Sequence, residues 1–158
     1  MIEEPASAVS FGMLEQVLGF RMQRLRAALA AQMLAAMKRW ALPQGAFMVL
    51  ALVQENPGLS QTMLVRETGI RKTLLVAVLH ELEARELLVR RALASDRRHN
   101  QLFITDTGQS VLIEMAEVVM DIEAPIREAL SDETMRHVKA ALDQALAAMR
   151  SDEEAKVA

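Results

Sequence analysis

Basic side chains are gathered in the middle of this sequence, where they could bind a polyanion. Between residues 60 and 98 the chain has eight arginines and lysines and five acidic residues, a net charge of +3 in a chain whose total is −3. The remaining residues therefore carry −6, and a basic segment between acidic ones is one indication of an anion-binding face. The densest group is Asp96-Arg97-Arg98, in which the carboxylate of Asp96 is within reach of Arg98 and could orient it.

Other kinds of side-chain chemistry have little support in the sequence. Without cysteine the chain has no disulfide, thiolate ligand or thiol nucleophile, and a redox sensor would have to use methionine oxidation. His80, His99 and His137 are far apart, and His80-Glu81 lacks the i, i+4 spacing that places two metal ligands on one helix face. No phosphate-binding loop, dinucleotide fingerprint or nucleophile elbow is found. We therefore expect no enzyme, no bound metal and no cofactor.

Length and composition are those of an ordinary globular domain. The 158 residues correspond to one domain by the usual length prior, and 52% apolar with 25% charged residues is typical of folded proteins. No apolar run approaches the ~18 residues of a membrane span, and the first residues are acidic where a signal peptide is basic. We therefore expect a cytoplasmic protein with no membrane partner.

Apolar residues recur at three- and four-residue steps through most of the chain, which predicts a mainly α protein. The first expected helix is about 40 Å long at 1.5 Å per residue, too long to pack fully against so small a domain, so part of it should contact another chain. Pro43 is expected in the first turn of a second helix, which is apolar nearly all round and therefore buried. The expected helices outside the central segment are Phe11–Arg39, Gln44–Glu55, Asp106–Glu123 and one that starts after Ser131, with a frayed tail over Ser151–Ala158.

The central segment predicts two short helices and a β-hairpin in succession. Ser60 is a suitable N-cap for a short helix, Gly69 breaks that helix, and another follows over Arg71–Arg85. Two apolar runs, Leu87–Arg91 and Gln101–Ile104, then surround an arginine-rich loop, which is the pattern of a hairpin. A helix-turn-helix followed directly by a basic hairpin is a winged helix, so we expect a mainly α fold with a small β-wing.

Three motifs of this winged helix resemble those of the MarR family of bacterial transcriptional regulators. They are the stretch Leu82–Arg90, the wing motif on Asp96 and Arg98, and the step from Ile104 through a capping Thr105 to Gly108. The resemblance implies a winged helix-turn-helix over residues 43–105. It also implies a helical dimerisation region made from residues 1–42 and 106–150, intertwined with the first region as one domain and followed by the tail 151–158.

The sequence departs from the family pattern at two places. Glu86 stands where the family commonly has glycine for a helix end with positive φ, which leaves the entry into the first strand open. Val76 and Ala77 stand where family members more often have Ser, Thr or Arg. Neither departure changes the expected fold.

The resemblance further implies a homodimer that binds double-stranded DNA and regulates transcription, most often as a repressor that a small effector releases. The operator would be pseudo-palindromic, with half-sites one helical turn, ~34–36 Å, apart. The effector would be an aromatic acid, a phenol or an aryl-CoA, bound between the dimer helices and the winged region. Activation, and a ligand that promotes DNA binding, remain open at this point.

The second helix of the motif would lie in the major groove with its N-terminal residues at the base edges. Its outward side would carry Arg71, Lys72, Thr73, Val76, Ala77 and His80, and its inward side Leu75, Val78, Leu79 and Leu82. One of the wing arginines, Arg97 or Arg98, would enter the minor groove. Arg66, Arg90 and Arg91 are candidates for phosphate contacts, or else solvated cations. Because the outward side has few polar groups, either its small apolar side chains touch thymine methyls or specificity comes from the wing and from DNA shape.

Five residues are candidates for binding the effector. Arg21 and Arg24 lie near the middle of the long first helix, where a carboxylate ligand would need a cation, although a solvated face or an intersubunit ion pair explains them as well. The thioethers of Met22, Met48 and Met115 could line an adaptable pocket, or could instead fill the core.

One alternative belongs to a different functional class. A winged helix with an apolar outward face could bind another protein and have lost DNA binding. The salt dependence of binding separates the two hypotheses, because phosphate contacts weaken steeply with added salt and an apolar protein interface changes little.

Overall fold

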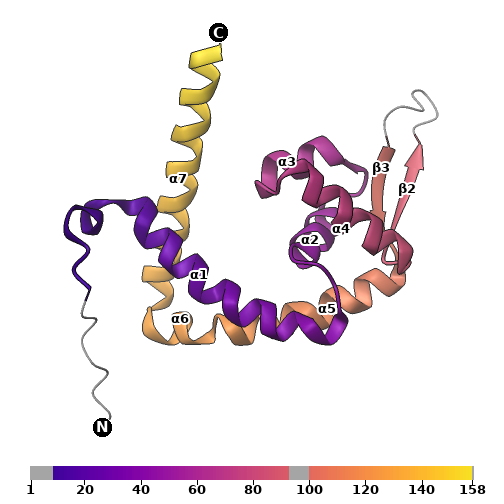
Figure 1. The fold of residues 1–158 in the computed structure, drawn as a ribbon, viewed down its shortest axis with the longest axis horizontal. Coiled ribbons are helices and arrows are strands. Elements are labelled where there is room, and N and C mark those ends of the chain that lie inside the picture. Colours follow the sequence, from indigo (N-terminus) through magenta and orange to yellow (C-terminus); the bar gives the residue numbers. More distant parts are fainter. Residues whose placement is uncertain (1–8, 93–99, 158) are drawn as a thin grey trace. The chain divides into compact units, whose positions relative to one another are not determined.

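The computed structural model describes residues 9–92 and 100–157 and consists mostly of helices with one small sheet (Figure 1). Two short 3₁₀ segments, η1 and η2, flank the first helix. The elements in chain order are η1 Gly12–Gln16, α1 Leu18–Met37, η2 Lys38–Trp40, α2 Ala46–Glu55, β1 Leu59–Ser60, α3 Gln61–Thr68, α4 Lys72–Ala84, β2 Leu88–Ala92, β3 Asn100–Ile104, α5 Asp106–Ile122, α6 Ala124–Ala129 and α7 Asp132–Val157. Among the described helices, none combines the length and the apolar character that crossing a membrane requires.

The chain divides into two compact units inside α5. The first unit is Met1–Val119 and contains the sheet, and the second is Met120–Ala158 and contains α6 and α7. We describe each unit by itself.

The sheet has three antiparallel strands in the order β1-β3-β2. In β2 and β3, Leu88 lies opposite Ile104 and Arg90 opposite Leu102, so the predicted hairpin is confirmed, with bounds that differ by one residue. The third strand, β1, pairs Leu59 with Leu102. We did not predict β1, because its two residues show no alternation and Ser60 also caps the next helix.

The hydrophobic core of the first unit is made by the sheet together with helices α2, α3, α4 and α5. Helix α4 buries the inward face that we predicted, and α2 and α5 add further side chains. The buried hydrophobic residues are Ala46, Val49, Leu50, Val53, Leu59, Leu64, Leu75, Val78, Leu79, Leu82, Leu87, Leu88, Leu102 and Met115. Among the described residues no polar or charged side chain is buried, so the core is held by apolar contacts alone.

The N-terminal helices begin later than predicted. Val17 is extended, with φ −90° and ψ 109°, so the expected helix Phe11–Arg39 is interrupted and α1 starts only at Leu18. Pro43 is not in the first turn of α2, because Gly45 at φ +95° interrupts the helical backbone between them. Most of α2 is buried or half-buried, as predicted, and Met48 is 43% exposed.

The second unit contains a short helix that the sequence analysis did not predict. Pro125 lies in the first turn of this helix, α6, where its missing N–H is not needed. The Ser131 side chain caps α7 as predicted and accepts a hydrogen bond from the Thr134 amide at 3.2 Å. Helix α7 then continues to Val157, so the prediction of a frayed tail from Ser151 was wrong.

Thr105 and Gly108 fasten the start of α5 to the turn that ends α4. The Thr105 hydroxyl accepts a hydrogen bond from the Gly108 amide at 2.9 Å and donates one to the Glu86 carbonyl at 2.6 Å. The Thr105 amide donates to the Leu87 carbonyl at 3.2 Å. A Cβ on Gly108 would overlap that same carbonyl oxygen and press on Ile104, so this approach of two backbones requires glycine.

Replacing Gly108 with alanine should therefore lower the free energy of unfolding by about 3 kcal/mol or more, because backbone atoms cannot give way as a flexible side chain can. Urea unfolding at a fixed protein concentration measures this change in the free energy of unfolding. The matched control is Gly19→Ala in α1, where a Cβ meets no atom within 4 Å and alanine should stabilise the helix by about 0.5 kcal/mol. Equal effects of the two substitutions would contradict the close approach at Gly108.

Candidate nucleic-acid interface

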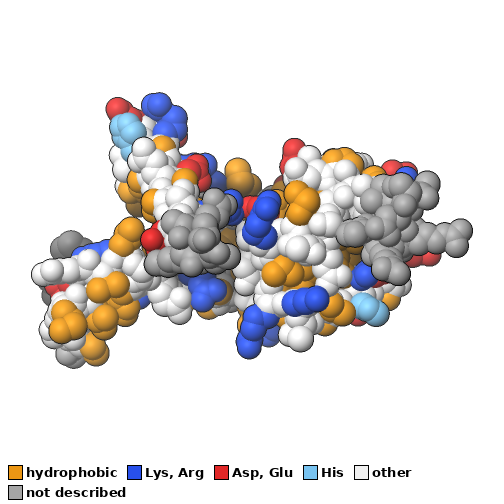
Figure 2. All heavy atoms as spheres, turned by 90° about the horizontal axis from the view of Figure 1, so that it is seen from above, with side chains coloured by type: hydrophobic (Ala, Val, Ile, Leu, Met, Phe, Trp, Pro, Cys, Tyr) orange, Lys and Arg blue, Asp and Glu red, His pale blue; other side chains and the backbone are white. Residues whose placement is uncertain are grey.

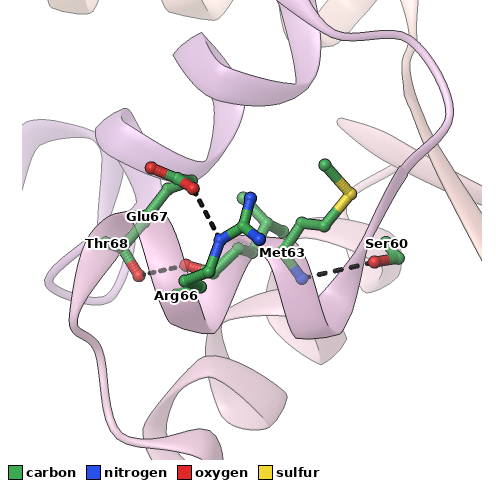
Figure 3. Close-up of polar contacts among 6 residues, drawn as sticks. Ser60, Met63, Arg66, Glu67 and Thr68 are labelled. Atoms are coloured by element: carbon green, nitrogen blue, oxygen red, sulfur yellow. Dashed lines mark hydrogen bonds and ion pairs between the residues drawn. The ribbon is translucent and has the colours of Figure 1, made fainter. Parts of the chain in front are cut away.

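Helix α3 is the first helix of a helix-turn-helix and both of its ends are defined by side chains or glycine. The Ser60 hydroxyl accepts a hydrogen bond from the Met63 amide at 3.2 Å, which confirms the predicted N-cap (Figure 3). At the other end the Thr68 hydroxyl donates to the Leu64 carbonyl at 2.6 Å, and Gly69 at φ +65° ends the helix. The turn into α4 is therefore fixed by local hydrogen bonds and one positive φ angle.

Helix α4 presents the surface predicted to face the nucleic acid. Opposite its buried face, the outward side leaves several side chains exposed, and Leu74, which we had not singled out, is 43% exposed among them. The exposed predicted residues are Arg71, Lys72, Thr73, Ala77 and His80, with Val76 half-buried. No side chain caps the first turn of α4, so its amide donors and the two N-terminal cations share one end of the helix. That end is suited to an anion such as a phosphate.

Arg66 on α3 also lies on the exposed surface. Its Nε atom donates to the Glu67 carboxylate at 2.8 Å, and its side chain remains 66% exposed (Figure 3). An exposed ion pair of this kind contributes little to stability, so the guanidinium can exchange Glu67 for a phosphate at little cost.

Strands β2 and β3 form the stem of the wing, and the two arginines of β2 are held in different ways. Arg90 on β2 donates from Nε to Glu83 of α4 at 2.8 Å, and its Nη2 atom is buried without a hydrogen-bond partner. Arg91 lies over the ring of Phe103 on the neighbouring strand, 4.7 Å from the ring centroid. Arg90 therefore joins the wing to α4, whereas Arg91 is exposed on the stem. The predicted wing-tip residues Asp96, Arg97 and Arg98 lie outside the described residues.

Helix α4 ends in a Schellman motif although the residue at its left-handed position is not glycine. The amide of Leu87 donates to the Leu82 carbonyl at 2.9 Å, and the amide of Glu86 donates to the Glu83 carbonyl at 3.0 Å. Glu86 has a φ angle of +57°. The departure from the family pattern therefore concerns the side chain, because the backbone at Glu86 has the positive φ that glycine would be expected to provide.

The five predicted effector residues are distributed over three helices. Met115 is 1% exposed and belongs to the core, while Met22 on α1 and Met48 on α2 are 44% and 43% exposed. Arg21 donates to the Glu15 carbonyl at 2.7 Å, and Arg24 lies over the Phe11 ring at 4.5 Å. The two arginines thus both contact the segment that precedes α1.

Within the described ranges, no group of three or more histidine, aspartate or glutamate side chains is arranged to hold a metal ion. The three histidines of the chain are His80, His99 and His137, of which His99 lies outside those ranges.

Arg85 is a functional candidate that sequence reasoning missed. It follows α4 directly, and its side chain donates hydrogen bonds to the carbonyls of Trp40 and Ala41, which lie more than forty residues earlier in the chain. A cation is favoured near a helix C-terminus, but only the fold brings this particular helix end to Arg85.

Sequence comparison gives a family match over most of the winged region and a curated relative. Residues 42–99 match the sequence model of the MarR family. A protein described as a transcriptional regulatory protein for the hcr operon of Thauera aromatica is 32% identical over 88 residues, which are 56% of this chain and 53% of that protein. The matched part therefore spans about half of the length of this curated relative.

Solved structures extend the similarity over most of the chain. The transcriptional repressor CouR, bound to a 23-mer DNA duplex, is 32% identical, with 91% of this chain and 99% of that chain covered and a TM-score of 0.71. A MarR family protein of Mycobacterium tuberculosis in complex with salicylic acid is 26% identical, with 81% and 95% covered and a TM-score of 0.66. The predicted mainly α fold with a small β-wing is confirmed.

The Schellman motif predicts the effect of replacing Glu86. Glycine adopts positive φ without the strain of an L side chain, so Glu86→Gly should raise the free energy of unfolding by about 0.5–1 kcal/mol. The matched control is Ala84→Gly, two residues earlier with helical backbone, which should lower it by a similar amount. Thermal and urea unfolding measure both variants, and a destabilised Glu86→Gly protein would show that the Glu86 side chain itself contributes to the fold.

Proposed function

Because the chain belongs to the MarR family of transcriptional regulators, we propose that it is a homodimeric repressor that binds a pseudo-palindromic operator and is released by a small aromatic acid or aryl-CoA. The observation that carries the proposal is the outward face of α4, with two cations at its N-terminus, opposite a fully apolar buried face. Neither face offers the clustered acids, bases or nucleophiles that an enzyme would use, and no enzymatic activity is part of the proposal.

In the proposed complex α4 lies in the major groove. Arg71 and Lys72 bind phosphates or guanine edges at the N-terminus of the helix, where the free amide donors also favour an anion. Thr73 and His80 supply the remaining polar contacts of this face. Leu74, Val76 and Ala77 meet thymine C5-methyl groups, because no polar atom of these side chains can read a base edge.

The wing completes the interface. Arg98 enters the minor groove and Asp96 orients it, with Arg97 beside them on the backbone. Arg66 and Arg91, both exposed, bind phosphates on either side. Arg90 acts mainly through its ion pair with Glu83, which holds the wing stem against α4.

The proposal of a dimer is supported by two helices, α1 and α7, in which every side chain described is exposed or only half-buried in the single chain. Helix α1 is twenty residues long, and not one of them is buried. Large hydrophobic side chains also reach the surface on α7 in the second unit, and Figure 2 shows such side chains on one face of the molecule. The residues concerned include Leu18, Met22, Leu25 and Leu34 on α1 and Val138, Leu146 and Met149 on α7. Apolar surface of this extent favours association with a second copy.

An aromatic acid is the effector class that suits Arg21 and Arg24. Arg21 already donates to a carbonyl oxygen, that of Glu15, and Arg24 already lies over an aromatic ring, that of Phe11. An aromatic acid would offer both contacts. Its carboxylate is a stronger acceptor for Arg21 than a carbonyl oxygen, and its ring could lie under Arg24. The relative bound to salicylic acid supports this class of ligand.

The test is a titration of the purified protein against its own upstream DNA at about 50 and 200 mM salt, with and without aromatic acids and their CoA thioesters. We expect tight binding that falls steeply with salt and is released by one compound of the panel. Binding without release by any compound would contradict the effector class. Failure to bind this DNA and selected random sequences at low salt would overturn DNA binding in favour of the protein-interaction alternative.

Variants locate the interface in the same assay. Arg71→Ala and Lys72→Ala should each weaken binding and reduce the salt slope by about 1 for each phosphate that the protein no longer neutralises, and Arg98→Ala should weaken it by about 1–3 kcal/mol. Arg136→Ala, on α7, removes the same charge outside the proposed interface and should leave the affinity unchanged. Equal affinities of all four variants would contradict the assignment of these residues.

Dimerisation is tested separately by sedimentation equilibrium. Leu25→Asp places a charge in the apolar surface of α1 and should shift the protein toward the monomer, because a buried carboxylate without a partner is strongly disfavoured. Gln32→Asp, at an exposed polar position of the same helix, should leave the dimer intact. A wild-type protein that sediments as a monomer contradicts the proposed homodimer, and a fully dimeric Leu25→Asp protein contradicts the role of α1.

A further inference from the structure

A single arginine fastens the end of α1 to the end of α4. The Arg85 side chain donates from Nη1 to the Trp40 carbonyl at 2.7 Å and from Nη2 to the Ala41 carbonyl at 2.9 Å. Its Nε atom donates to the Glu81 carboxylate, one turn back on α4, at 2.6 Å. We call these three hydrogen bonds the Arg85 fork. They use three separate nitrogen atoms of one planar group, so the position of α4 relative to the end of α1 is geometrically defined.

The two carbonyls that the fork binds lack partners from their own helix. Trp40 is the last residue of η2, which continues α1, and the last carbonyls of a helical run have no intrahelical donor. Beyond them Ala41 turns the chain into the left-handed region, with φ 48° and ψ 32°, and Pro43 has no amide hydrogen to offer. A guanidinium at this point donates to both oxygens, and its positive charge interacts favourably with the negative end of the helix dipole.

The left-handed conformation of Ala41 is a second indication that contacts from outside the α1–η2 run hold this junction. An alanine with positive φ is strained, and such a conformation persists where the surrounding contacts over-determine it. The Arg85 fork is the contact made by the Ala41 carbonyl itself.

Further contacts attach the same junction to α5. The Trp40 indole donates to the Glu114 carboxylate at 3.4 Å, and the Arg39 guanidinium lies 3.5 Å from the same oxygen and 3.8 Å from the Trp40 ring centroid. The Arg39 and Glu114 side chains are more than half exposed and their contact is long, so it is the weaker attachment. The Arg85 fork is therefore the principal polar link between the end of α1 and the winged helix.

We propose that Arg85 is the positioning residue that fixes the recognition helix α4 relative to α1, and so sets the half-site spacing that an operator must have. The second part rests on the proposed function, in which α1 belongs to the dimer interface and α4 lies in the groove. If α1 is held by a partner copy, the fork determines where each α4 stands, and a dimer with defined α4 positions accepts one spacing of half-sites.

The fork can be broken with little change in volume. Arg85→Met keeps most of the aliphatic stem and removes every donor, and Arg85→Lys keeps the charge but has no planar fork for two carbonyls. Glu81→Gln is the matched control, because it removes the charge on the carboxylate side and leaves both carbonyl bonds available. Thermal unfolding establishes whether each variant is folded. If Arg85→Met is not folded, Arg85→Lys takes its place in both measurements.

The first measurement is independent of DNA. The chain has no cysteine, so Gln32→Cys on α1 and Ala77→Cys on α4, both at exposed positions, can carry two spin labels without background labelling. With unlabelled chain in excess, the distance distribution reports one chain only. We expect a narrow distribution in the otherwise unchanged protein and with Glu81→Gln, and a clearly broader one with Arg85→Met and Arg85→Lys. Equal widths in all four proteins overturn the proposal.

The second measurement compares operators whose half-sites are separated by one base pair more or less. Each step moves a half-site by about 3.4 Å and rotates it by about 34°, so a dimer with fixed α4 positions should bind about tenfold or more weakly. With Arg85→Met the three operators should differ by no more than about threefold. A folded Arg85→Met protein with an unchanged spacing preference overturns the role in spacing.

The two measurements keep the proposals apart. If the wild-type protein binds none of the operators, the proposed function fails, and the spin-label distances still decide whether Arg85 holds α4 to α1. If the wild-type protein binds the operator, and neither the spin-label distances nor the spacing preference changes when Arg85 is replaced, the proposed function stands and the Arg85 proposal fails.

Discussion

The joint between the end of α4 and the start of α5 is the constraint on which the geometry of the winged helix depends. The Thr105 hydroxyl binds the Glu86 carbonyl and caps α5, and Gly108 lets the first turn of α5 lie directly on the Leu87 carbonyl. Leu87 and Leu88 pass immediately from this joint into the core. The wing therefore starts from a fixed point, and its stem is further held to α4 by the ion pair of Arg90 with Glu83.

The same turn also contacts the end of the α1–η2 run. Arg85 directly precedes the left-handed Glu86, and its guanidinium binds the carbonyls that end the α1–η2 run. Residues 85–87 thus contact the end of this run and the residue that precedes α5, and they lead directly into β2. In the proposed dimer, a turn with contacts in each direction is a suitable place to couple α4 to events elsewhere in the molecule.

The division of side chains on α4 is compatible with the proposed DNA-binding surface in a chain whose net charge is negative. One face supplies four fully buried aliphatic residues, and the other supplies exposed Arg71, Lys72 and Thr73. Cations at the N-terminus of a helix would repel the helix dipole in isolation, so their position there is better explained by an external anion than by the stability of the helix. The acidic residues of the chain lie mostly on other elements.

The sequence by itself determined the helix-turn-helix, the hairpin, the inward face of α4 and the caps at Ser60, Thr105 and Ser131. These features depend on residues within a few positions of one another, through periodicity, capping hydrogen bonds and glycine conformations, which a local pattern contains. Only the tertiary structure decided the two-residue strand β1, whose pairing partner is about forty residues away, and the break at Val17. It also decided the environments of Met115, Arg24 and Arg85. Each of these three environments depends on which backbone or ring from another part of the chain lies beside the residue. Tertiary packing determines that neighbour, and local propensity does not.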